Sequence, residues 1–159
     1  MITLMRFDSP GQVDALVAAW RDTSLPAERW THHAHLVVAL DHVLRTDAEM
    51  ALAQVREGIR RLNVAHGVPE SPTRGYHETI TRFYMWVVAQ FVAGAPSIPR
   101  HELANRLIER LGDKRLPLHY YSEARLMSWA ARIGWLEPDL APLDTLPDSD
   151  NGSPGPASR

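Results

Sequence analysis

The chain has 159 residues and a mass of 17.9 kDa, with 45% hydrophobic and 23% charged residues, which is typical of one soluble globular domain. A formal net charge of −2 argues against nucleic acid as a partner, because a basic surface is what draws a domain to phosphate backbones. The chain has no cysteine, so any metal ion has to be held by histidine, carboxylate or tyrosine. It shows no secretion signal and no apolar run of the roughly 18–20 residues that a membrane span needs, so we expect a cytoplasmic protein without a membrane partner.

Two helices are predicted in the first third of the chain. Ser9 and Pro10 form a typical helix start, in which a cap residue precedes a proline at the first helical position, and Pro26 ends that helix. Thr31 is placed to cap a second helix over residues 32–45, where leucine and valine recur at helical spacing.

The next two helices have the clearest apolar patterns. Thr46 and Glu49 supply a capping box for a third helix, which ends at Gly67. After a turn-rich segment, a fourth helix is predicted to start near Tyr76 and to end before Gly94. Its apolar arc is wide, which predicts a central position in the fold.

Two shorter helices and a tail complete the prediction. Pro99 opens a fifth helix, and Ser122 is placed to cap a sixth one that reaches Ile133. No strand-like alternation occurs between hairpin turns, so the predicted fold class is all-α: a single-domain bundle of about five to six helices over residues 1–143. Pro, Gly, Ser and Asp dominate residues 144–159, which predicts a disordered C-terminal tail.

Several of the eight histidines stand at predicted helix starts. On a helical wheel His32 lies in the middle of the apolar arc of its helix, His35 borders that arc one turn later, and His77 borders the arc of the fourth helix. If the second, third and fourth helices alternate in direction, these side chains meet at one end of the bundle, together with His33 and His66. Neutral imidazoles from two or three helices are typical ligands of zinc, iron, copper or nickel, so we predict a divalent transition metal held by His32, His35 and His77.

This arrangement supports one function and leaves two alternatives open. A bound divalent ion polarises a carbonyl and activates water, so the first hypothesis is a metal-dependent enzyme acting on a small polar molecule, with Glu78 or Tyr121 as the acid–base group. On the helical wheel Glu78 lies on the outward face beside Arg82, which argues against an acid–base role for Glu78. The second hypothesis is a non-catalytic module that binds a small ligand or a partner helix and whose histidines are structural. The third is a bundle that senses pH, and a homodimer stays open in each case.

Other side chains are predicted to have structural or surface roles. Arg56, Arg60 and Arg61 follow a pattern typical of a solvated helix face. His42 is predicted at the surface or in an interface, and His66 as a cation that a helix C-terminus favours.

Four segments resemble a family of small bacterial helical proteins of unassigned function: WTHHAHL at 30–36, RRLNVAHG at 60–67, GYHETIT at 75–81, and YYS at 120–122 with EPDL at 137–140. The resemblance covers roughly residues 10–143 and implies an ordered bacterial domain without a catalytic role to carry over. The histidines also give a weaker analogy to DinB-like helical bundles, which bind a metal through three histidines.

Overall fold

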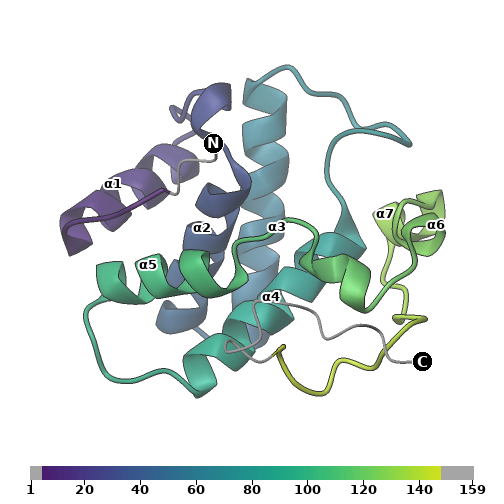
Figure 1. The fold of residues 1–159 in the computed structure, drawn as a ribbon. Helices are drawn as coiled ribbons and strands as arrows, with labels where there is room; N and C mark the ends of the chain where they lie inside the picture. The colour runs from purple at the N-terminus through teal and green to yellow at the C-terminus, as the bar shows by residue number, and fades with distance from the viewer. Residues whose placement is uncertain (1–4, 148–159) are drawn as a thin grey trace.

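The computed structural model describes residues 5–147, and within them it contains seven α-helices and no β-strand (Figure 1). The helices are Pro10–Arg21 (α1), His32–Arg45 (α2), Ala48–Ala65 (α3), Glu78–Ala93 (α4), Arg100–Leu111 (α5), Glu123–Leu126 (α6) and Trp129–Ile133 (α7), with 3₁₀ turns at Ala27–Arg29 (η1) and Leu116–His119 (η2). The predicted all-α class is confirmed.

Side-chain caps begin most of these helices, as the sequence predicts. Ser9 and Thr31 accept backbone N–H groups at the starts of α1 and α2. The cap of α3 is Asp47 rather than the predicted Thr46, and its carboxylate accepts the N–H of Met50 at 2.8 Å. A carboxylate at this position also interacts favourably with the helix dipole, which a threonine hydroxyl does less strongly.

The predicted sixth helix is broken into two short ones. Ser122 caps α6 as predicted, but Ser128 interrupts the helix and caps α7 through the N–H of Ala131. The same Ser128 hydroxyl donates to the carbonyl of Arg125 at 2.7 Å. A serine that bonds both to the preceding turn and to the following one ends the first helix where the pattern alone predicts continuity.

Helix α2 lies at the centre of the fold and contacts α1, α3, α4 and α5. Helix α4 runs obliquely across α2 and α3 instead of lying antiparallel to them (Figure 1). Its wide apolar arc is therefore covered on several sides, by α2 and α3 and by α7, which agrees with the predicted central position.

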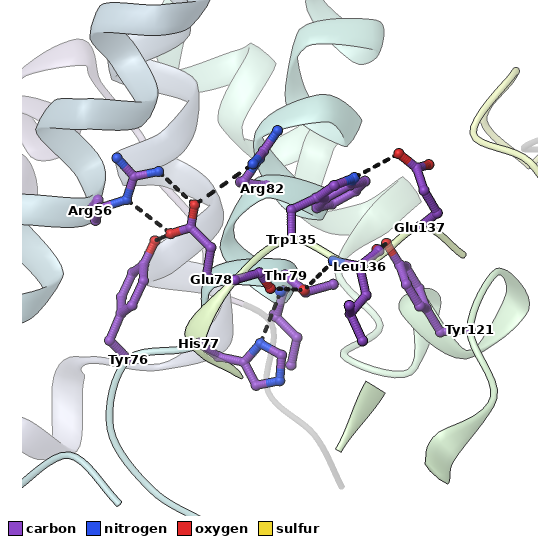
Figure 2. Close-up of polar contacts among 12 residues, drawn as sticks. Arg56, Tyr76, His77, Glu78, Thr79, Arg82, Tyr121, Trp135, Leu136 and Glu137 are labelled. Carbon is purple, nitrogen blue, oxygen red and sulfur yellow. Dashed lines mark hydrogen bonds and ion pairs between the residues drawn. The ribbon is translucent and has the colours of Figure 1, made fainter. Parts of the chain in front are cut away.

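The first turn of α4 is tied to the segment around α7. The Thr79 hydroxyl donates to the carbonyl of Gly134 at 2.7 Å and accepts the N–H of Leu136 at 3.1 Å (Figure 2). These two bonds join the start of α4 to the segment that follows α7.

The chain stays in contact with the core beyond the predicted domain boundary at residue 143. The Tyr120 hydroxyl donates to the carbonyl of Thr145 at 2.9 Å, and Leu146 packs against the core. The remainder of the predicted tail, residues 148–159, lies outside the described residues. None of the helices in the described part combines the length and hydrophobicity that crossing a membrane requires.

Candidate functional site

A pocket of about 250 Å³ opens between α2, α3 and α4. We call it the histidine pocket, and its lining residues are Trp30, His32, His35, Leu36, Val38, Ala39, Val55, Ile59, Ile80, Thr81, Tyr84 and Met85. None of these described lining residues carries an Asp, Glu, Lys or Arg side chain. An apolar cavity of roughly 150 Å³ is enough to take up benzene, so the histidine pocket has room for a small organic molecule.

A second hollow, of about 360 Å³, lies beside α1. Its lining includes apolar side chains such as Phe7 and Leu16, together with the exposed Arg6 and Arg29. None of the buried polar atoms that lack a partner in the described residues belongs to this lining. The histidine pocket is the stronger candidate because two histidines line it and no charged side chain does.

His35 lines the pocket, and one hydrogen bond fixes its tautomer. Its Nδ1 lies 2.8 Å from the carbonyl oxygen of Thr31, and since a carbonyl only accepts, Nδ1 carries the proton. Nε2 is then left as a hydrogen-bond acceptor. The ring stacks on Trp30 with 3.6 Å between centroids, and burial lowers the pKa of His35 to about 4, so the imidazole is neutral at pH 7.

His32 also lines the pocket. Its Nε2 is buried and has no hydrogen-bond partner among the described residues. The ring meets Tyr84 edge to face at 4.9 Å between centroids. Burial, followed by the neighbouring His35 and His33, lowers the pKa of His32 to about 4. An unpaired buried nitrogen costs free energy, and the protein encloses this one, so a molecule in the pocket does not reach it.

His77 is not part of the pocket, because it caps α4. Its Nδ1 accepts the N–H of Ile80 at 3.1 Å (Figure 2). Its Nε2 donates to the carbonyl of Leu126 at 2.8 Å. Both ring nitrogens are therefore occupied in the neutral form, and burial lowers the pKa of His77. No lone pair remains for a metal ion.

The predicted three-histidine metal site is not formed. Among residues 5–147 no group of three or more histidine, aspartate or glutamate side chains is arranged to hold an ion. His32 and His35 share one pocket, but the oblique course of α4 brings His32 against Tyr84, well inside that helix, and not against His77. The assumption of matched, antiparallel helix ends was wrong, and the residues present do not fit a transition metal held by His32, His35 and His77.

Glu78 is held in a buried ion pair. Both of its carboxylate oxygens accept from Arg56, at 2.9 and 2.6 Å, and Oε1 also accepts from the Tyr76 hydroxyl at 2.7 Å (Figure 2). Arg82, its predicted helix partner, is more distant at 4.0 Å. Although burial by itself raises it, the hydrogen bonds from Arg56 and Tyr76 lower the pKa of Glu78 overall. A carboxylate with these bonds is a fixed anion, which does not suit the predicted acid–base role.

The outward position predicted for Glu78 was therefore wrong, and so was the solvated position of Arg56. The helix starts at Glu78 rather than near Tyr76, and its first turn packs against α3, where Arg56 is half-buried. The partner comes from another helix, so no spacing within one helix could have revealed it.

Tyr121 also has a structural role. Its side chain is fully buried, and its hydroxyl donates to the carbonyl of Leu136 at 2.7 Å (Figure 2). Burial raises the pKa of Tyr121 to about 12. Tyr121 does not line the histidine pocket, so the two predicted acid–base residues and the predicted ligands are not brought to one site.

Of two further histidines, His42 differs from expectation and His66 stands where it was predicted. His42, predicted at the surface, is buried against Trp20 and bonds through Nδ1 to the carbonyl of Val38 at 2.8 Å. His66 stands at the end of α3, where its Nε2 is hydrogen-bonded to the carbonyl of Leu25 at 2.7 Å.

Sequence patterns predict no site role for Trp30 and Tyr84, which line the pocket. Aromatic residues at helical spacing are ordinarily core residues, and only their position beside His35 and His32 distinguishes these two. The sequence WTHHAH does place Trp30 next to the histidines, which is the one local signal available.

Comparisons with family models, with curated proteins and with solved structures find no match for this chain.

Proposed function

We propose that this protein is a non-catalytic module that binds a small organic molecule in the histidine pocket. The observation that carries the proposal is a pocket without charged side chains in which the fixed tautomer of His35 leaves Nε2 as a hydrogen-bond acceptor. Ligand pockets are typically apolar with a few polar groups that orient the ligand, and this lining has that composition.

The protonation state of the histidines favours binding over catalysis. A general base works best when its pKa lies near the working pH. The pKa values of His32 and His35, both lowered to about 4, make these imidazoles weak bases at pH 7. They remain good hydrogen-bond acceptors, which is what ligand recognition needs.

Isothermal titration calorimetry with toluene and with phenol tests this proposal. We expect at least one of them to bind the wild-type protein with a dissociation constant near 1 mM or tighter, which corresponds to about −4 kcal/mol. The variant Ala39→Leu adds atoms inside the pocket and should abolish the binding.

Ala53→Leu is the matched control, because it adds the same atoms at an exposed position of α3 outside the pocket. It should bind like the wild type, and circular dichroism checks that both variants are folded. If neither probe binds the wild type, or if both variants bind equally well, the proposal is wrong.

A further inference from the structure

We infer that the ligand of the histidine pocket is a neutral, planar molecule with an N–H or O–H donor on its rim, and that Nε2 of His35 accepts this hydrogen bond. The inference rests on the proposed function and specifies the chemical class of the ligand.

The lining argues for a neutral ligand. Among the described lining residues none is charged, and the nearest carboxylate on α4, Glu78, is already paired with Arg56. An ion that enters such a pocket loses its hydration and gains no opposite charge, which is strongly unfavourable.

The tautomer of His35 argues for a donor on the ligand. The bond from Nδ1 to the Thr31 carbonyl fixes the proton on Nδ1, so Nε2 can only accept. A ligand with only acceptor groups would find no donor on this ring. His32 lines the pocket as well, but the protein encloses its Nε2, so His35 supplies the acceptor.

The aromatic side chains argue for a flat molecule. Trp30 and His35 are stacked with 26° between their planes, and Tyr84 meets His32 edge to face. Flat rings pack on such surfaces by offset stacking or edge contacts at favourable distances. Aliphatic side chains such as Ile59 and Met85 cover other parts of the wall and supply apolar contact.

Phenol and toluene are a matched pair for the test, because they have the same size and differ only in a hydroxyl in place of a methyl group. A purely apolar pocket prefers toluene, since it leaves the hydroxyl of phenol without a partner. We expect phenol to bind the wild type at least about tenfold more tightly than toluene, the effect of one net hydrogen bond. Benzylamine, a cation at pH 7, should bind at least about tenfold more weakly than phenol, because its charge has no partner in the pocket.

The variant His35→Phe keeps a ring against Trp30 and removes the acceptor. We expect it to lose the preference for phenol and to bind toluene within about twofold of the wild type. His33→Phe is the matched control, because His33 neighbours the pocket histidines in sequence but does not line the pocket, and it should keep the preference.

If His35→Phe does not fold, ¹⁵N NMR of the wild-type imidazoles decides the question. The Nε2 resonance of His35 should move when phenol is added and stay in place with toluene. Equal affinities for the two probes, tighter binding of benzylamine than of phenol, or an unmoved Nε2 resonance would overturn the inference while the proposed function stands. If neither phenol nor toluene binds, the proposed function itself fails.

Discussion

The role of each histidine depends on whether its ring nitrogens are already bonded. Position on a helical wheel correctly predicts that His32 and His35 lie on one side of α2, and they line the same pocket. The wheel gives no information about His77, because this residue precedes the helix and caps it. A histidine cap is uncommon compared with Ser, Thr, Asp or Asn, so the cap could not be recognised from the residue type.

Replacement of His77 separates capping from other roles. We expect His77→Ala to lower the free energy of unfolding by about 2 kcal/mol, because it removes the cap and leaves the Leu126 carbonyl without its donor. His77→Asn restores a capping side chain and should recover about 1 kcal/mol of that loss. Urea denaturation of the three proteins measures the difference, and equal stability of wild type and both variants would contradict the assignment.

Loss of the buried ion pair between Glu78 and Arg56 is expected to lower the free energy of unfolding more than loss of the His77 cap. Glu78→Gln leaves the half-buried Arg56 without its counter-charge, and we expect a loss of about 3 kcal/mol in the free energy of unfolding. Glu57→Gln is the control, because Glu57 pairs with Arg61 on the surface, and it should cost less than about 0.5 kcal/mol. Similar small losses in the two variants would mean that the buried pair does not stabilise the fold.

At the scale of elements, the sequence predicts where helices begin more reliably than how they cross. Ser9, Thr31 and Ser122 cap helices as expected, because a cap is a local interaction among residues a few positions apart. Helix α4 crosses α2 and α3 obliquely and is bonded through Thr79 to residues more than fifty positions later, and no local pattern contains either feature. The metal prediction was wrong for this reason, since it depended on how the helix ends meet.

The close approach of α1 and α3 depends on a glycine. A Cβ atom built on Gly58 would lie 2.1 Å from the ring of Trp20, which is itself almost fully buried. We expect Gly58→Ala to lower the free energy of unfolding by about 2–3 kcal/mol through overpacking, although alanine favours helix.

Gly11→Ala is the matched control for that substitution, because Gly11 lies in α1 with no atom closer than 3.7 Å to the new Cβ. It should stabilise the protein by about 0.5–1 kcal/mol. Thermal unfolding of both variants measures the contrast, and a stable Gly58→Ala protein would show that α1 and α3 can move apart at little cost.

At the scale of the whole molecule, buried neutral histidines make stability depend on pH. Burial lowers the pKa of His32 and His35 from the ordinary value of 6.5 to about 4, and it also lowers the pKa values of His42 and His77. At His32, repulsion from the positive charge of Lys114, and from His35 and His33 wherever they are protonated, lowers the pKa in addition to burial, and Asp113 raises it. The unfolded chain therefore binds protons that the folded chain does not in the range between about pH 6.5 and 4.

The contribution of the buried neutral histidines to the free energy of unfolding is fully present above about pH 6.5 and is lost as the pH falls towards 4. We expect the free energy of unfolding to drop by on the order of 2 kcal/mol between pH 7 and pH 5, a range in which Glu78 stays ionised. The double variant His32→Phe, His35→Phe should show a weaker dependence over the same range. Urea denaturation at several pH values provides the measurement, and a flat profile for the wild type would contradict the buried, neutral state of these rings.

NMR of methionine methyl groups would show directly whether the histidine pocket binds a small neutral molecule. Met85 lines the pocket, whereas Met50 and Met127 are about half exposed and lie outside it. The protein is labelled with methyl-¹³C methionine and titrated with phenol. We expect a saturable shift of the Met85 signal, while the Met50 and Met127 signals stay in place. An unchanged Met85 signal, or equal shifts at all three methionines, would contradict it.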